Sequence, residues 1–89
     1  MSFSDHAVEE IKFPLKVHFK VIAVESPNLR AHLEIALCDL RIYDDLEPGR
    51  SSAAGKYITY NLSMMVHSRE QMTSIDQRLR EVEGVKMVL

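Results

Sequence analysis

The chain has 89 residues, of which 46% are hydrophobic and none is tryptophan, and its formal net charge at pH 7 is −2. This length fits one small domain with an aliphatic core. The acidic balance provides no basic surface for nucleic acid or anionic lipid, so we expect neither a nucleic-acid nor a membrane partner. Cys38 is the single cysteine, which excludes an intrachain disulfide and favours a reducing compartment.

Residues 1–12 show no sign of a targeting segment. They lack the basic and apolar regions of a signal peptide, and no apolar run in the chain approaches the roughly 20 residues that a membrane helix needs. We therefore expect a cytoplasmic protein. Residues 1–12 are predicted to be an N-terminal arm, and residues 13–89 a single domain.

The first expected elements are a strand and a helix. Apolar and polar residues alternate over residues 15–24, which is typical of a strand with one buried face. Ser26 and Pro27 fit the N-cap and the first position of a helix. The spacing of the apolar residues then predicts a helix from Pro27 to Cys38, with one stripe formed by Leu29, Leu33, Ala36, Leu37 and Leu40.

The middle of the chain is expected to form a β-hairpin. A short edge strand is predicted near Leu46, and the turn-forming residues from Pro48 to Gly55 indicate a flexible hairpin loop. Residues 57–67 alternate again and predict the longest strand, with Tyr60 facing the core and Met65 facing outward.

The last third of the chain predicts a second helix and a final strand. Residues 68–71 (Ser-Arg-Glu-Gln) form a capping box, and Gly84 provides a left-handed stop. Residues 85–89 are apolar enough for a strand. The apolar stripe of this helix consists of Met72, Ile75, Leu79 and Val82.

The predicted order β-α-β-β-α-β indicates an α+β, ferredoxin-like two-layer sandwich. Strands with one apolar face and helices with one apolar stripe predict a four-stranded antiparallel sheet with two helices on one face. The first and third strands should be central, and the second face should be open. On that open face we expect Ile22, Met65 and Val88 among polar residues, which favours docking of a partner there or along an edge strand.

Three segments resemble a known family. They are the stretch from Arg50 to Tyr57, the long alternating strand, and the ending Val85-Lys86-Met87-Val88-Leu89. Together they resemble the YbeD family of small bacterial proteins of unknown function, over roughly residues 13–89. The resemblance implies a ferredoxin-like fold similar to that of ACT regulatory domains, with no established activity.

A fourth segment, residues 25–29, resembles the acidic-x-Pro-Gly-Leu turn that opens the first helix of ACT domains. In those domains the glycine lets the backbone approach an amino acid bound across a dimer interface. Here Asn28 stands in place of that glycine, and its side chain occupies the space that glycine leaves open. The resemblance makes Glu25, Ser26 and Asn28 candidate ligand-binding residues where a neighbouring chain meets this turn.

The glycine-containing loop supplies a second group of candidates. It does not match a phosphate-binding loop, because five residues rather than four separate Gly49 from Gly55 and Tyr57 stands where serine or threonine would bind magnesium. A plain hairpin loop is the favoured interpretation. The residues that could still hold an anionic group are Arg50, Ser51, Ser52 and Lys56.

No metal, cofactor or catalytic group is expected. His6, His18, His32 and His67 lack metal-ligand spacing, although His18 and His67 could meet if their strands paired in a suitable register. Cys38 lies one position from the helical stripe and is expected to be a half-buried packing residue. The acidic residues of the connection lack the spacing of a calcium loop and should be solvated: Asp44, Asp45 and Glu47.

These observations favour a non-enzymatic, ACT-like regulatory or adaptor domain that acts through protein–protein association. The alternative is a sensor that binds an amino acid or an anionic metabolite at a subunit interface. An enzyme is disfavoured because no acid and base are paired in the sequence. RNA binding is disfavoured because the open face offers only Tyr57, at a strand end, for base stacking.

Overall fold

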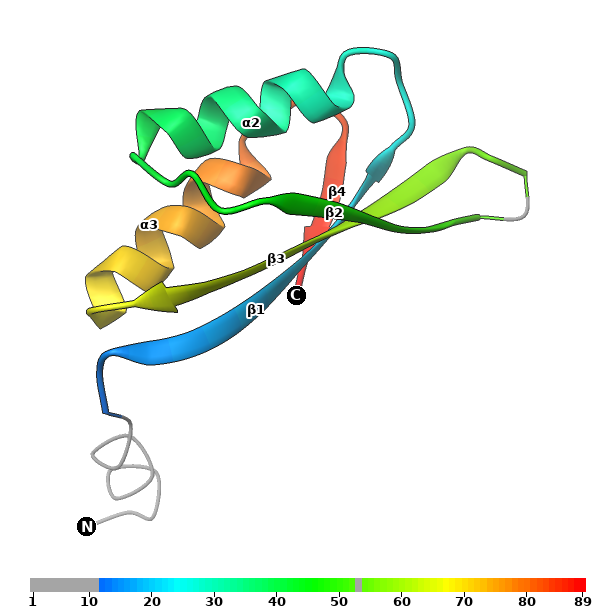
Figure 1. Ribbon diagram of the computed structural model, residues 1–89. Coiled ribbons are helices and arrows are strands. Elements are labelled where there is room, and N and C mark those ends of the chain that lie inside the picture. The colour runs from blue at the N-terminus through cyan, green and yellow to red at the C-terminus, as the bar shows by residue number, and fades with distance from the viewer. Residues whose placement is uncertain (1–11, 53) are drawn as a thin grey trace, which may run out of the picture.

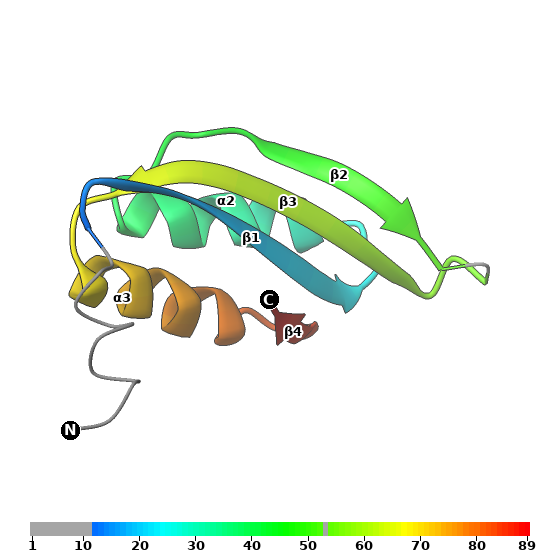
Figure 2. The ribbon, with the colours of Figure 1, turned by 90° about the horizontal axis from the view of Figure 1, so that it is seen from below.

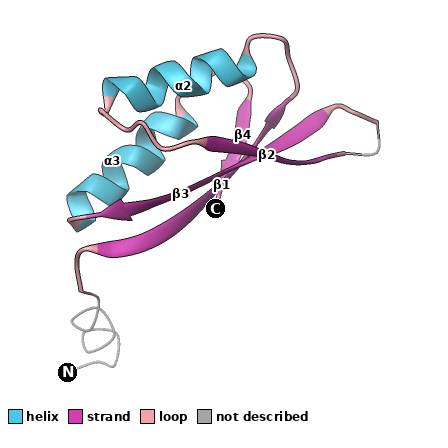
Figure 3. Cartoon of the chain, in the orientation of Figure 1, coloured by secondary structure: helices cyan, strands magenta, loops and turns pink. Residues whose placement is uncertain are grey.

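A computed structural model describes residues 12–52 and 54–89, so all of the expected N-terminal arm except Lys12 lies outside the described residues. The elements follow the predicted β-α-β-β-α-β order (Figure 1; Figure 3). They are β1 (Leu15–Val24), α2 (Leu29–Asp39), β2 (Leu46–Ser51), β3 (Tyr57–Val66), α3 (Arg69–Arg80) and β4 (Val85–Val88).

The four strands form one antiparallel sheet in the order β2-β3-β1-β4. The central strands β1 and β3 pair along their whole length, from Leu15 opposite Val66 to Val24 opposite Tyr57. Both helices lie on one side of this sheet (Figure 1). In Figure 2, α2 lies behind β1 and β3, and no described helix covers the nearer face. The ferredoxin-like architecture predicted from the sequence is therefore confirmed.

The core lies between the sheet and the two helices. Because side chains alternate along a strand, every second residue of β3 faces this layer. The same alternation buries Val21 and Ala23 of β1, while α3 contributes Ile75 and Leu79. The inward residues of β3 are all buried, as predicted: Ile58, Tyr60, Leu62, Met64 and Val66.

Helix α2 begins at Leu29, and the prediction that it begins at Pro27 with Ser26 as N-cap was wrong. The carboxylate of Glu25 accepts a hydrogen bond from the backbone N–H of Ser26 at 2.9 Å. The Ser26 carbonyl in turn accepts from the N–H of Leu29 at 3.3 Å. These bonds close a turn before the helix, and Asn28 occupies the N-cap position without a side-chain cap bond. The predicted apolar stripe is confirmed, with Leu29, Leu33, Ala36 and Leu37 buried.

Strand β2 includes residues that the sequence placed in a flexible loop. It continues through Pro48 and Gly49 to Ser51, so the loop is limited to residues 52–56. Proline is tolerated because β2 is an edge strand, where a backbone N–H can be dispensed with. The register shifts between Pro48 and Ser51. Gly49 lies so close to β3 that an added Cβ would be 3.0 Å from Nδ2 of Asn61.

Helix α3 begins as predicted but ends earlier than predicted. The Ser68 hydroxyl accepts from the backbone N–H of Gln71 at 3.0 Å. The Gln71 side chain reaches back and accepts from the N–H of His67 at 2.6 Å, one residue earlier than in the standard capping box. The helix ends at Arg80 with Glu81 as its C-cap, so the prediction that Gly84 stops the helix was wrong; Gly84, with a φ of 92°, adopts the predicted left-handed conformation in the turn before β4.

The uncovered sheet face differs from the prediction at one position. Met65 faces outward as predicted and is 46% exposed. Val88, however, is buried. The β1–β4 register shifts between Ile22 and Ala23, so that Met87 lies opposite Ile22 and shares its outward face. Met87, which is also 46% exposed, therefore takes the place that the sequence assigned to Val88.

Candidate functional site

The two groups of candidate ligand residues lie at the same end of the molecule. The last pair of the β1–β3 ladder joins Val24 to Tyr57. One residue further, the backbone N–H of Glu25 donates to the carbonyl oxygen of Lys56 at 2.8 Å. The turn before α2 is therefore attached to the base of the β2–β3 hairpin, a proximity that the sequence did not indicate.

The turn before α2 borders a shallow pocket of about 410 Å³. Ser26 and Asn28 line it, together with Val24, His32 and the turn between α3 and β4 at Glu83 and Gly84. The backbone of Asn28 has φ −102° and ψ 0°, which does not require glycine. Asparagine at this position therefore affects the pocket through its side chain and not through backbone strain.

The hairpin residues form no closed anion site. The Ser52 hydroxyl accepts from the backbone N–H groups of Lys56 and Tyr57, both at 3.1 Å, and so stabilises the loop. The ammonium of Lys56 lies 5.4 Å from the centre of the Tyr57 ring. Arg50 and Ser51 are exposed on β2. Within residues 12–52 and 54–89, no side-chain hydrogen bond connects Arg50 or Ser51 to the other two candidates.

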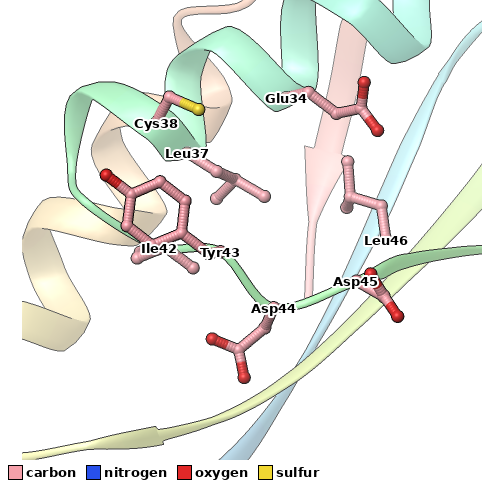
Figure 4. Close-up of a pocket in the computed structure, with 8 residues that line it drawn as sticks. All are labelled: Glu34, Leu37, Cys38, Ile42, Tyr43, Asp44, Asp45 and Leu46. Atoms are coloured by element: carbon pink, nitrogen blue, oxygen red, sulfur yellow. The ribbon is translucent and has the colours of Figure 1, made fainter.

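A second pocket, of about 270 Å³, lies where α2 connects to β2 and was not predicted from the sequence. Figure 4 shows Glu34, Leu37 and Cys38 on α2 above the connection that bears Tyr43 and two aspartates. Leucine and isoleucine side chains form its apolar part, and carboxylates lie around it. Its lining residues are Glu34, Leu37, Cys38, Ile42, Tyr43, Asp44, Asp45 and Leu46.

This second pocket exists because the chain reverses sharply after α2. Arg41 has a φ of 60°, a left-handed conformation that glycine usually adopts at a helix end. The reversal lets the N–H of Ile42 donate to the carbonyl of Leu37 at 2.9 Å and buries the Ile42 side chain. At helix ends of this kind, an apolar residue two positions after the C-cap accompanies an apolar residue in the last turn. Ile42 and Leu37 hold these two positions, and this apolar pair was the one signal in the sequence that could have indicated the sharp reversal.

The prediction for Cys38 is wrong, and the structure decides against the contact between two histidines that the sequence left open. Cys38 is exposed, not half-buried, because it points away from the buried stripe of α2 toward the second pocket. His18 lies opposite Ser63, with its Nδ1 atom 2.6 Å from the serine hydroxyl, so it does not meet His67. In the described part of the chain, no three histidine, cysteine, aspartate or glutamate residues are grouped as metal ligands.

The uncovered sheet face forms a third candidate surface. A shallow hollow of about 490 Å³ extends over it and is lined in part by His18, Lys20 and Leu89. Leu89 is 63% exposed, next to the outward pair Ile22 and Met87. Among the described residues, every buried side chain is hydrophobic. The uncovered face therefore presents apolar side chains at Ile22, Met87 and Leu89 beside the polar side chains of His18 and Lys20.

The sequence model of a family described as "Protein of unknown function (DUF493)" matches residues 8–89. The chain belongs to this family. A "UPF0250 protein" of Shewanella piezotolerans is 31% identical over 81 residues, which are 91% of this chain and 92% of that protein. A "UPF0250 protein" of Haemophilus influenzae strain Rd is 30% identical over 82 residues, 91% of this chain and 88% of that protein. The resemblance to the YbeD family is thereby confirmed.

Solved structures extend the likeness of this DUF493 protein to ACT domains. Protein HP0495 from H. pylori has a TM-score of 0.82 at 22% identity, over 100% of this chain and 96% of that one. The ACT domain from GTP pyrophosphokinase of Chlorobium tepidum has a TM-score of 0.62 at 17% identity, over 84% of this chain and 95% of that one. At these identities the likeness shows a shared fold. Within the described residues, no helix combines the length and apolarity required to cross a membrane.

Proposed function

We propose that this DUF493 protein is a non-enzymatic regulatory or adaptor domain of the cytoplasm that acts by associating with another protein or with itself. The observation that carries the proposal is the uncovered sheet face with Ile22, Met87 and Leu89 side by side on it. Exposed apolar residues grouped on one face favour an interface. The ACT-like fold agrees with a regulatory role, although a fold alone does not determine a function.

The test uses a photo-crosslinking amino acid placed in the full chain. At position 87 it would lie on the uncovered sheet face, and at position 35 it would lie on the outer side of α2. The native side chains at these two positions are comparably exposed, 46% for Met87 and 56% for Ile35. We expect position 87 to give a crosslinked product with one protein or with a second copy, and position 35 to give none. Equal crosslinking from both positions, or none from either, would contradict the proposal.

A second candidate function, a small-molecule sensor, is supported by the pocket beside the turn before α2. Ser26 and Asn28 line this pocket, and the Glu25–Lys56 hydrogen bond attaches the turn to the hairpin that bears Ser52. A ligand would be an amino acid or an anionic metabolite. In this proposal Glu25, Ser26, Asn28, Arg50, Ser51, Ser52 and Lys56 are the candidate contacts, with a neighbouring chain completing the site.

A thermal-shift screen of amino acids, nucleotides and anionic metabolites tests the sensor. A ligand at 100 times its Kd stabilises a protein by about 2.7 kcal/mol, a shift of many degrees in a domain of this size. We expect Asn28→Val to abolish the shift without unfolding the chain, because its bulkier β-branched side chain would occupy the pocket. A shift that persists in the variant would contradict this placement, and a flat screen would leave protein association as the supported function.

A further inference from the structure

Among the described strands, β1 has partners on both sides over only part of its length. Strand β3 pairs with all of β1, but β4 pairs only with Val21 to Ala23. Beyond them, Lys20 and Leu89 exchange two backbone hydrogen bonds, at 3.0 and 2.8 Å. Figure 2 shows β4 beside only the second half of β1. None of the described strands pairs with residues 15–19 on that side.

The backbone groups of two residues point outward along this unpaired part. Lys20 directs both its N–H and its C=O toward Leu89. Because these directions alternate along an antiparallel strand, Lys16 and His18 direct theirs to the same side, whereas Val17 and Phe19 direct theirs to β3. A regular strand with outward N–H and C=O groups is a template on which another strand can add.

The two faces of this edge differ in chemistry. On the side of the helices, Leu15, Val17 and Phe19 are only partly buried. Phe19 borders a hollow of about 280 Å³ that is also lined by Met72, Thr73 and Asp76, and the Asp76 carboxylate accepts from Arg80 at 2.8 Å. On the uncovered side, the exposed side chains of β1 belong to Lys16, His18 and Lys20. A strand added here would therefore meet apolar side chains on one face and two lysines on the other.

The opposite edge of the sheet is less suited to strand addition. It is formed by β2, which contains Pro48 and shifts its register before Ser51. Proline and irregular register are the devices by which proteins prevent edge pairing. The unpaired part of β1 has neither feature.

A second copy of the chain is a poor occupant of the β1 edge. In a two-fold antiparallel pairing of β1 with itself, the lysines of both copies would lie on the same face as near cross-strand neighbours. Like charges in such positions are destabilising. The same lysines would attract carboxylates, so charge complementarity selects an acidic strand.

We infer that the edge of β1 at Lys16 and His18 binds an extended segment of a partner protein in which acidic residues alternate with apolar ones. The segment adds antiparallel to β1, with acidic side chains opposite Lys16 and His18, the second of them diagonal to Lys20, because Leu89 already occupies the position opposite Lys20. Its apolar side chains point toward Phe19 and Met72. This inference rests on the proposed association and adds a second contact, at the other end of β1 from Ile22 and Met87, together with the chemistry of the partner.

The first test titrates the isotope-labelled full chain with a short peptide of alternating glutamate and valine. We expect the amides of Lys16 and His18 to become protected from hydrogen exchange. The amides of Val17 and Phe19 already face β3 and should change little. Spectral changes confined to the turn before α2 or to the hairpin, with none at Lys16 and His18, would overturn the inference.

Methylated peptides distinguish strand addition from general charge attraction. In antiparallel pairing, the residue opposite His18 points its side chain to the same face, so it is a glutamate, and its N–H faces β1. Methylation of the glutamate nitrogens should weaken binding by about tenfold or more, whereas methylation of the valine nitrogens should leave it nearly unchanged. Equal affinity of the two methylated peptides would overturn the inference.

Charge-reversal variants test the role of the lysines. Lys16→Glu should weaken binding of the glutamate–valine peptide by about tenfold and favour a matched lysine–valine peptide. Arg41→Glu makes the same change of charge after the C-terminus of α2, outside the sheet, and should leave the affinity within about twofold. If both variants weaken binding equally, only net charge matters and the assigned edge is wrong.

These outcomes also distinguish this inference from the proposed function. Crosslinking from position 87 together with unaltered exchange at Lys16 and His18 would leave protein association standing and exclude the β1 edge as its site. A second copy of the chain as the occupant would appear as a dimer in light scattering that Lys16→Glu strengthens by pairing glutamate with lysine. That result would overturn the assignment to an acidic partner segment.

Discussion

The backbone N–H of Glu25 donates to the carbonyl oxygen of Lys56 at 2.8 Å, one residue beyond the last pair of the β1–β3 ladder. This bond holds the turn before α2 against the β2–β3 hairpin, so two segments with separate candidate roles share one end of the molecule. Ser52 completes the junction, because its hydroxyl accepts from the backbone N–H groups of Lys56 and Tyr57. The Ser52 hydroxyl is therefore expected to stabilise the conformation of the β2–β3 hairpin loop at this end of the molecule.

Replacing Ser52 by alanine should loosen the hairpin. The change removes the acceptor of two backbone N–H groups, which we expect to cost about 1 kcal/mol of unfolding free energy in urea and to accelerate amide exchange at Lys56 and Tyr57. Ser51→Ala is the matched control, since Ser51 is exposed on β2 and its change should stay within about 0.5 kcal/mol. Equal effects of the two variants would contradict the assigned role of the Ser52 hydroxyl.

Replacing the serine before each helix by alanine should change the stability of the protein by different amounts. Ser68→Ala removes the cap bond to Gln71 and should destabilise the protein by about 1 kcal/mol, a fall in Tm of roughly 4–8 °C. Ser26→Ala should change Tm little, because the Ser26 side chain does not cap α2. A larger loss from Ser26→Ala than from Ser68→Ala in calorimetry would reverse this assignment.

The strands β1 and β3 and the two apolar stripes were predictable because local periodicity encodes them, whereas β2 has no such period. Residues 15–24 alternate with period two, and the structure forms β1 over the same residues. The N-terminus of α2 was not predictable from the preference for a serine cap alone. There the carboxylate of Glu25 takes the N–H of Ser26, and a separate turn precedes the helix.

Features that depend on register or on rare backbone conformations could not be predicted from the sequence. The shift between Ile22 and Ala23 decides that Met87 is exposed and Val88 buried, and it depends on how β4 meets β1 in space. The pocket between α2 and β2 depends on the left-handed conformation of Arg41, a residue type that rarely adopts it. The proximity of Glu25 and Lys56 likewise follows from the β1–β3 register.

Two substitutions in α2 test the position of the core. Leu33 is fully buried, so Leu33→Ala should destabilise the protein by about 2–5 kcal/mol, through lost burial and the cavity left behind. Ile35 is 56% exposed on the same helix, and Ile35→Ala should cost less than about 0.5 kcal/mol. Unfolding in urea measures both values. Similar losses for the two variants would mean that the helix is rotated about its axis from the orientation described.

Gly84 links α3 to β4 in a conformation that favours glycine. Its φ is 92°, and its carbonyl accepts from the N–H of Val24 at 2.9 Å, which fixes the start of β4 against the end of β1. Gly84→Ala should cost about 1–2 kcal/mol in urea unfolding because an L side chain is strained at positive φ. The nearest atom to an added Cβ is the Val24 carbonyl oxygen at 3.7 Å, so a large loss would reflect backbone strain and not a clash. A neutral outcome would show that this turn tolerates another conformation.

The final prediction concerns the apolar group on the uncovered sheet face. Met87→Lys places a charge beside Ile22 and Leu89, and a charge in the centre of an apolar contact is costly to desolvate. We expect association with the crosslinked partner to weaken by about tenfold or more, measured by calorimetric titration. Because Met87 is 46% exposed, its replacement should leave Tm nearly unchanged.

Met65→Lys is the matched control for this face. Met65 is also 46% exposed, but it lies opposite Lys16 at the other end of β1, away from the pair formed by Ile22 and Met87. If the interface centres on the Ile22 and Met87 pair, Met65→Lys should weaken association far less than Met87→Lys. Equal weakening would extend the interface along the whole of β1, and no weakening by either variant would mean that association uses another surface of the domain.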